Sequence, residues 1–278
     1  MATGHYTAAN NKMGVLAAAL RWFAQNSSGG LVEFIQLLEG LPPDAGGGIS
    51  QAEKLAKSMA DSLKARIQID PLFGHAGTPV DPAMLFESAN PAKVRLSIVN
   101  FFGLTTQEGQ RQFLNRLAMT LFAWIKKHPA PQEQPLRGLL VIDEAKDFIP
   151  SGKASICKAS LMRLAAQARK YGLGLVFATQ APRDIENTVV SNCFTQVFGR
   201  MNSPRTIEAV QQLLQQQGIS GEDVPQLHRG VFYVSNASVI KPPARIAAPL
   251  CLSWHPNSPL TEMEIARLAK ASATALGR

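Results

Sequence analysis

The feature that most constrains this chain is a run of apolar residues that ends in two adjacent acids. The run covers residues 138–142, with the sequence GLLVI, and the acids are Asp143 and Glu144. A strand with no polar residue before its end is expected to be covered on both faces, as in a parallel sheet. Its acids would lie at the carboxyl edge of that sheet, where open α/β folds bind ligands. The pattern therefore predicts an α/β protein with a site at this edge.

A second apolar run, residues 173–178, ends in Thr179-Gln180. If the two strands are neighbours, the Gln180 amide lies close to the acids. In an ATPase, the first acid of such a pair holds the Mg²⁺ shell and the second activates the attacking water. We therefore expect Asp143 to hold Mg²⁺ through water, Glu144 to act as the base and Gln180 to contact the γ-phosphate or the water. The alternative is that the two acids only cap a strand or open a loop.

The segment between the two runs has the apolar spacing of a helix, and Gly172 is placed to end it. Three basic residues, Arg163, Arg169 and Lys170, fall outside its apolar face. Arg169 stands one turn before the helix end, so it could reach the phosphates of a neighbouring subunit as an arginine finger. Alternatively, it is a solvated basic residue that complements the helix macrodipole.

These segments resemble the HerA/FtsK group of RecA-like motor ATPases, and most closely the HerA-like proteins. The resemblance rests on LLVIDEAKDF and on ARKYGLGLVFATQAPRDIENTVVSNCFTQVFGRMNSP. It implies Asp143 as the metal-shell acid, Glu144 as catalytic base, Gln180 as phosphate sensor and Arg169 as a candidate finger acting in trans. It also implies Arg200 as a second basic contact at the site. The alternative for Arg200 is a charged residue that closes an edge strand.

The same resemblance implies a RecA-like P-loop NTPase sheet, with ATP and Mg²⁺ as cofactors and DNA as the partner. It implies helicase or DNA translocase activity in a homo-oligomer, a hexameric ring in the full-length form, with a possible nuclease partner. Head-to-tail contacts close such a ring, and Arg169 of one subunit would meet the nucleotide of the next.

The chain contains no Gly-x-x-x-x-Gly-Lys-Ser/Thr phosphate-binding loop. The nearest candidate, PSGKAS at residues 150–155, has Asp147 at the place of the first glycine and Ala154 at that of the Mg²⁺-binding hydroxyl. It also follows the acid-bearing strand, so we interpret it as an ordinary loop. We expect the chain to be the C-terminal portion of a longer ATPase, with an incomplete sheet and little or no ATP hydrolysis by itself.

Two other functions stay open. One is a non-enzymatic partial subunit that acts in assembly or DNA binding. The other is a metal-dependent nuclease, because Glu144-Ala145-Lys146 satisfies the Glu-x-Lys half of a common nuclease site. That site needs another acid on a preceding strand, and residues 94–102 contain none.

Composition sets outer limits on these functions. With 278 residues, 46% of them apolar and 17% charged, the chain can bury a sizeable core. The net charge of +8 suits an anionic partner, although the basic residues are scattered. Three cysteines without Cys-x-x-Cys spacing indicate reduced thiols in a cytoplasmic protein. The sequence has no apolar run long enough for a membrane span, and its polar start does not resemble a signal peptide.

Apolar stripes at helical spacing predict three helices within residues 12–67. We predict a helical insertion subdomain over residues 1–70 and a distal ATPase core over residues 71–278. Alternatively, the three helices belong to the core of the main domain. The later patterns predict a strand at 94–102, a helix over 113–127, strands at 194–200 and 231–234, a helix from Ser203-Pro204 to Gly218, and a last helix opened by the capping box TEME at 261–264.

Overall fold

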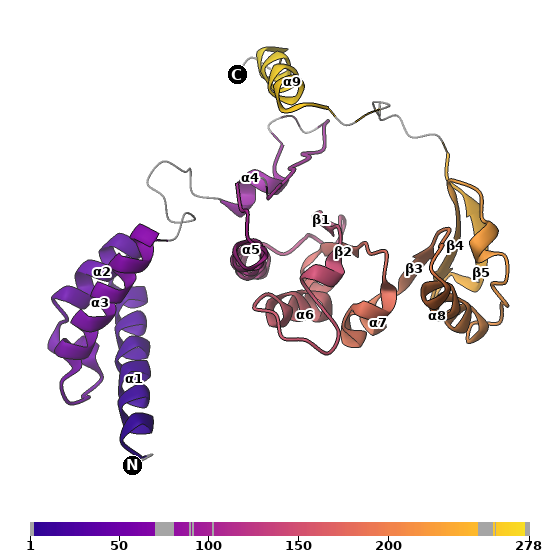
Figure 1. Ribbon diagram of the computed structural model, residues 1–278. Coiled ribbons are helices and arrows are strands. Elements are labelled where there is room, and N and C mark those ends of the chain that lie inside the picture. The colour runs from indigo at the N-terminus through magenta and orange to yellow at the C-terminus, as the bar shows by residue number, and fades with distance from the viewer. Residues whose placement is uncertain are drawn as a thin grey trace. The chain divides into compact units, whose positions relative to one another are not determined.

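The computed structural model describes residues 3–69, 81–88, 90, 92–101, 103–249, 258 and 260–275. The chain divides into two compact units, Met1–Leu85 and Phe86–Arg278 (Figure 1). The predicted domain boundary after residue 70 falls next to residues outside this description, so the domain limits stay a prediction. In the described residues, no helix combines the length and apolar content that crossing a membrane would require.

The first unit contains the three predicted helices. Their bounds are α1 Thr3–Asn26, α2 Leu31–Glu39 and α3 Ala52–Ile69, with the 3₁₀ turn η1 Pro43–Gly46 between α2 and α3. A shared core of Val15, Ala19, Phe34, Ile35, Leu38, Ala56 and Ala60 holds the helices together. The Glu33 carboxylate accepts a hydrogen bond from the Gly30 N–H at 2.8 Å, which caps the start of α2. The short helix α4, Pro82–Phe86, follows, and Asp81 caps it by accepting from the Ala83 N–H at 3.0 Å.

The second unit contains the predicted parallel strand pair. Strands β1 (Gly138–Ile142) and β2 (Leu173–Phe177) pair in parallel, with Leu140 opposite Leu175. The connection between them is helical, formed by η3 Ala145–Asp147, α6 Lys158–Gln167 and η4 Ala168–Tyr171. Gly172 ends this connection with a φ of +84°, and a Cβ there would lie 2.2 Å from the Ala130 Cβ. This mixed α/β arrangement with a short parallel sheet confirms the predicted fold class.

Helix α5, Gln107–Lys127, precedes β1 and matches the predicted long helix. The Thr106 hydroxyl caps it by accepting from the Gly109 N–H at 3.1 Å. Buried residues of α5, β1, β2, α6 and α7 (Asn187–Asn192) form one core. Its buried members include Leu114, Ala118, Ile125, Ile142, Ile149, Leu161, Leu164, Leu173 and Val189.

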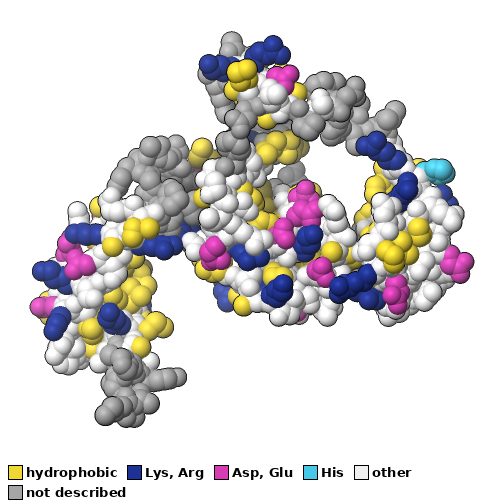
Figure 2. All heavy atoms as spheres, viewed as in Figure 1, with side chains coloured by type: hydrophobic (Ala, Val, Ile, Leu, Met, Phe, Trp, Pro, Cys, Tyr) yellow, Lys and Arg dark blue, Asp and Glu magenta, His cyan; other side chains and the backbone are white. Residues whose placement is uncertain are grey.

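Only one face of the β1–β2 pair is covered by the described chain, so the predicted burial of both faces is wrong there. Leu139 is 54% exposed, Val141 58% and Val176 42%. Val141 and Val176 are register partners, and Leu139 lies two residues before Val141 on the same face. Figure 2 shows apolar side chains on the described surface of the protein. The covering helices supply apolar side chains to the opposite face alone, which leaves this one in contact with solvent.

Residues 94–101 form no strand, so the strand predicted at 94–102 is not found in the described part of that segment. Val94, Leu96 and Ile98 are 95%, 81% and 81% exposed. Their alternation is that of an extended chain, but a strand also requires a neighbour to pair with, and a sequence pattern does not supply one.

A second sheet in this unit is antiparallel, in the order β3-β4-β5. Its strands are β3 Thr195–Phe198, β4 Val231–Asn236 and β5 Ile240–Ala247. Helix α8, Pro204–Gln215, packs on it through Val210 and Leu214. Strand β5 was not predicted because it contains Pro242 and Pro243, yet an edge strand tolerates the missing N–H groups.

The predicted capping box opens α9, Glu262–Ala275. The Glu264 carboxylate accepts from the Thr261 backbone N–H at 2.8 Å and from its hydroxyl at 2.7 Å. These hydrogen bonds favour the ionised carboxylate and lower the pKa of Glu264.

Candidate functional site

The carboxyl ends of β1 and β2 are held together beyond the strands themselves. The Ala178 N–H donates to the Ile142 carbonyl at 2.9 Å, and the Ala145 N–H donates to the Ala178 carbonyl at 2.9 Å. These two bonds fix the segments that carry Glu144 and Gln180 against each other. Glu144 and Gln180, which follow two separate strands in the sequence, thus lie at one edge of the sheet.

Glu144 and Gln180 are in direct contact at this edge. The Gln180 Nε2 donates a hydrogen bond to the Glu144 Oε1 at 2.6 Å. Glu144 has a φ of +47° and a ψ of +45°, the left-handed region that a non-glycine residue rarely occupies. Such a conformation costs on the order of 1–3 kcal/mol and is often found at functional sites. The backbone therefore holds this carboxylate in a strained position next to the amide.

The second carboxylate oxygen of Glu144 has a different environment. Its Oε2 is buried and accepts no hydrogen bond from the described residues. The Lys146 ammonium lies 3.8 Å from it, within the range of an ion pair but beyond a hydrogen bond. One carboxylate oxygen is thus held by an amide, and the other is buried without a hydrogen-bond partner among the described residues.

Asp143 lies directly before Glu144 and is exposed. Its Oδ1 accepts from the Glu144 N–H at 3.0 Å, which is a local turn contact. Among the described residues, no group of three or more His, Cys, Asp and Glu side chains could hold a metal ion. A carboxylate next to solvent fits the way proteins bind Mg²⁺, with one or two carboxylates, several waters and substrate phosphates. The Mg²⁺ role of Asp143 stays a prediction.

Arg169 lies at the other end of β2. It belongs to η4, which ends immediately before β2 begins, whereas Gln180 follows the end of β2. A strand of five residues spans roughly 16 Å, so one chain does not bring Arg169 to its own acid pair. The Arg169 guanidinium instead lies over the Phe194 ring, 4.9 Å from its centroid. A finger role would have to act on another subunit, as the sequence analysis predicted.

Arg200 follows β3, in the antiparallel sheet, and is exposed. Within the described chain it makes no hydrogen bond or ion pair with Asp143, Glu144 or Gln180. Its predicted role as a basic contact at the site stays a prediction.

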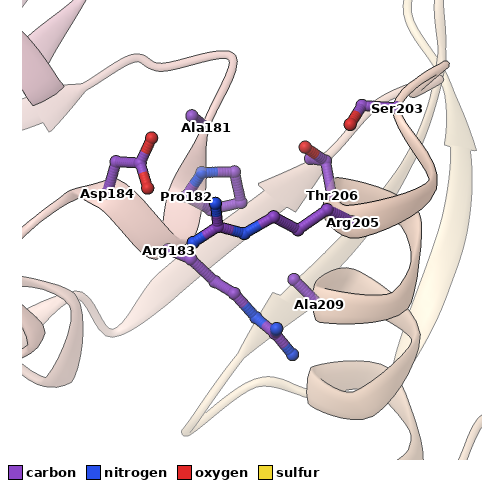
Figure 3. A pocket seen from close by; sticks show the side chains of 8 residues that line it. All are labelled: Ala181, Pro182, Arg183, Asp184, Ser203, Arg205, Thr206 and Ala209. Atoms are coloured by element: carbon purple, nitrogen blue, oxygen red, sulfur yellow. The ribbon is translucent and has the colours of Figure 1, made fainter.

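A hollow of about 230 Å³ begins directly after Gln180 in the chain (Figure 3). It lies between η5, Pro182–Asp184, and the start of α8. Its lining residues are Ala181, Pro182, Arg183, Asp184, Ser203, Arg205, Thr206 and Ala209. The Arg183 Nη2 donates to the Gln212 Oε1 at 2.5 Å, so the side chain is tied to α8.

Arg183 and Arg205, which flank this hollow, were not predicted from the sequence. They come from segments that only the folded chain brings together. The available signals were the Pro182-Arg183 step after the second strand and the Ser203-Pro204 helix start before Arg205. Neither is specific.

Sequence comparison finds relatives of parts of this chain, although no protein-family model matches it. A probable DNA double-strand break repair helicase HerA from Methanocaldococcus jannaschii is 25% identical over 130 residues, which cover 46% of this chain and 25% of that protein. A DNA double-strand break repair helicase HerA from Pyrococcus furiosus is 30% identical over 67 residues, 24% of this chain and 12% of that protein. Protein P9 of Pseudoalteromonas phage PM2 is 37% identical over 65 residues, 23% of this chain and 28% of that protein.

Similar solved structures include two proteins that cover more than half of this chain. The DNA-packaging ATPase B204 from Sulfolobus Turreted Icosahedral Virus has a TM-score of 0.40 and 15% identity, over 60% of this chain and 69% of that chain. The bacterial conjugative coupling protein TrwBΔN70 has a TM-score of 0.49 and 17% identity, over 90% of this chain and 64% of that chain.

The sequence matches show weak homology to HerA helicases and confirm the resemblance to the HerA/FtsK-type motor ATPases. The matched segment spans about a quarter of the Methanocaldococcus protein.

Proposed function

We propose that this chain supplies the Walker B acids and the sensor amide of an ATP-driven DNA translocase of the HerA/FtsK type. The observation that carries the proposal is the 2.6 Å hydrogen bond between Gln180 and Glu144 at the carboxyl edge of a parallel strand pair. An acid and an amide in contact at this edge are suited to activating a water and sensing the phosphate that it attacks.

Each residue of the proposed site has a separate role. Asp143 would hold Mg²⁺ through water, and the ion would supply positive charge to offset that of the ATP phosphates. Glu144 takes the proton of the attacking water, and Gln180 holds the carboxylate through Oε1 until the γ-phosphate offers the amide another partner. Arg169, from a neighbouring subunit, and Arg200 are the candidate basic contacts to the phosphates.

In this proposal, the groups that bind the nucleotide phosphates come from outside these 278 residues, because their sequence contains no phosphate-binding loop. The backbone N–H groups and the lysine of such a loop supply much of the binding to the nucleotide. We therefore propose that the chain alone turns over ATP negligibly, and that a polypeptide carrying the loop completes the site.

DNA as substrate, a homo-oligomeric and hexameric ring, and a nuclease partner belong to the same proposal. The names of the sequence relatives support DNA as the partner, since both HerA proteins are described as helicases of DNA double-strand break repair. A cytoplasmic location is the setting predicted from the cysteine content.

The experiment that tests the proposal measures ATP binding and turnover with and without a loop-bearing polypeptide. We expect neither tight binding nor turnover by the chain alone, and both after the loop is supplied in cis or in trans. Tight ATP binding by the chain alone, with turnover that Glu144→Gln abolishes, would contradict the proposed division of the site.

A non-enzymatic partial subunit is the second candidate, favoured by the exposed apolar face of Leu139, Val141 and Val176. Exposed apolar surface of this kind marks interaction sites. It predicts association with another polypeptide and no turnover even when a phosphate loop is supplied. The nuclease alternative predicts Mg²⁺-dependent nicking of plasmid DNA that is lost in Lys146→Ala.

A further inference from the structure

Four exposed basic residues lie at the amino edge of the β1–β2 pair, opposite the edge that carries the acids. Lys126 and Lys127 end α5, and Arg169 and Lys170 lie in η4 immediately before β2. We call these four residues the amino-edge patch. They come from two helical segments far apart in the sequence.

Contacts between the two segments show that the patch is one surface. The Ala130 N–H, just after α5, donates to the Tyr171 carbonyl at 3.0 Å. The rings of Phe122 and Tyr171 meet edge to face with centroids 6.3 Å apart. The Arg137 N–H donates to the Gly172 carbonyl at 2.7 Å, which anchors the loop that leads into β1. The end of α5 and the end of η4 are therefore packed side by side.

The charges of the patch are not neutralised within the described chain. None of its four side chains forms an ion pair there, whereas Arg137 nearby is paired with Glu87 at 3.3 Å. Residues 126–137 and 168–172 contain one acidic residue, Glu133, which lies in the loop between α5 and β1. A helix dipole attracts cations to the C-terminal end of the helix, but four cations on one edge repel one another. Such a surface is stabilised by a polyanion.

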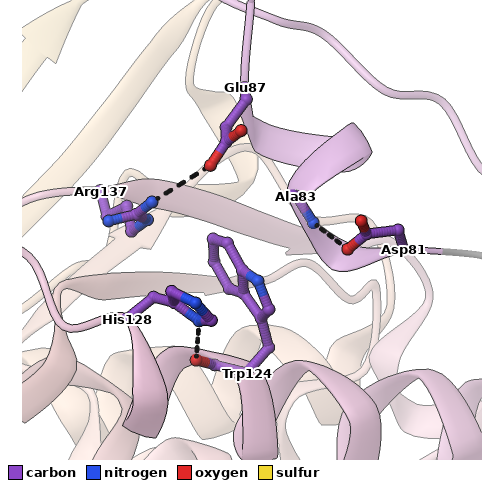
Figure 4. Close-up of polar contacts among 6 residues, drawn as sticks. All are labelled: Asp81, Ala83, Glu87, Trp124, His128 and Arg137. Atoms are coloured by element: carbon purple, nitrogen blue, oxygen red, sulfur yellow. Dashed lines mark hydrogen bonds and ion pairs between the residues drawn. The ribbon is translucent and has the colours of Figure 1, made fainter.

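Aromatic rings accompany the cations. Phe194 is 55% exposed and lies beneath the Arg169 guanidinium. The exposed His128 ring stacks on the Trp124 indole at 5.1 Å, and the Arg137 guanidinium lies 4.8 Å from the same indole (Figure 4). Proteins that bind single-stranded nucleic acid combine basic side chains along the backbone with rings on which bases stack.

We propose that the amino-edge patch binds the backbone of single-stranded DNA, with Phe194 and His128 as the surfaces on which bases stack. The choice of DNA rests on the proposed function, but the contacts do not involve the acid pair. DNA and nucleotide then occupy opposite edges of the same two strands. Arg169 contacts a DNA phosphate in this arrangement, in place of the nucleotide of a neighbouring subunit.

The experiment measures binding of the whole chain to fluorescein-labelled oligothymidylate by anisotropy, without nucleotide, over a range of salt concentrations. The test variant is K126Q/K127Q/K170Q. The matched control K54Q/K57Q/K153Q loses the same charge from exposed lysines outside the patch. We expect the test variant to bind at least tenfold more weakly, with the slope of log K against log salt reduced by about 2. The control should stay within about twofold of wild type.

Phe194→Ala tests the stacking surface and is expected to weaken binding by about fivefold or more with the salt slope unchanged. Circular dichroism spectra and melting curves check that each variant is folded. Equal losses in the test and control variants, an unchanged affinity in the test variant, or a preference for duplex over single strands would each overturn the proposal. Because nucleotide is absent throughout, failure of the proposed ATPase site would leave these results unchanged.

Discussion

Arg169 and Gln180 lie beyond opposite ends of β2, Arg169 four residues before Leu173 and Gln180 three residues after Phe177. The five residues of β2, which span roughly 16 Å, separate the two within one chain. If both act on ATP, they act on two different nucleotides, and the site is assembled from two subunits. If Arg169 instead binds DNA, its loss affects DNA binding first.

The trans role of Arg169 predicts complementation between variants once the phosphate loop is supplied. Arg169→Ala alone should lower turnover by about 10³-fold or more if it is a finger. Mixing it with Glu144→Gln subunits should restore part of the activity, at sites built from one intact face of each. Arg163→Ala, an exposed arginine on α6, is the matched control. Near wild-type turnover by Arg169→Ala in saturating DNA would assign this residue to the DNA surface alone.

The exposed face of β1–β2 predicts self-association of the chain. Leu139, Val141 and Val176 present a contiguous apolar surface next to strand edges that no described strand pairs with, a combination that promotes pairing with other chains. We expect light scattering to show a mass that rises with protein concentration. Val141→Thr with Val176→Thr should reduce this rise, while Val239→Thr, at a site that is 80% exposed elsewhere in the unit, should not. A monodisperse monomer at high concentration would show that this face does not associate.

The ion pair between Lys158 and Glu186 predicts a pH-dependent contribution to stability. The Lys158 Nζ lies 2.5 Å from the Glu186 Oε2, and this hydrogen bond lowers the pKa of Glu186. A group whose pKa is lowered on folding stabilises the folded state above its unfolded pKa, and this contribution is lost as the pH falls through the folded value.

Glu186→Gln should therefore lower the Tm at neutral pH, by a few degrees at most because the pair is partly exposed. The difference from wild type should vanish in acid, below the lowered pKa of Glu186. Glu222→Gln, at an exposed glutamate, is the control and should leave the Tm unchanged at both pH values. A difference that persists unchanged into acid would show that the ion pair is not its cause.

The sequence patterns of the two strands predicted that Glu144 and Gln180 lie close together. Two apolar runs joined by one helix favour a parallel pair, and the pair brings Glu144 to Gln180. The left-handed backbone of Glu144 was not predictable, because no glycine or asparagine marks it. The hollow between Arg183 and Arg205 was not predictable either, since it depends on how η5 packs against α8.

Contacts between segments that are distant in the sequence also explain the errors in the predicted fold. The patterns at residues 94–102 and 138–142 predicted strands, and the second strand was expected to be covered on both faces, but periodicity reports which residues can be buried and not what pairs with them or covers them. Strand β5 shows the reverse case, because pairing with β4 overrides the low strand propensity of its two prolines.

The most direct test of the account is ATP turnover by a single protein in which the phosphate loop and this chain are joined, compared between wild type, Glu144→Gln and Gln180→Ala. The wild type should hydrolyse ATP, and Glu144→Gln should bind ATP but not turn it over, because the amide keeps the shape of the carboxylate and loses the base. Gln180→Ala should lower turnover while retaining ATP binding. Full turnover by Glu144→Gln would contradict the assignment of this carboxylate, and with it the proposed site.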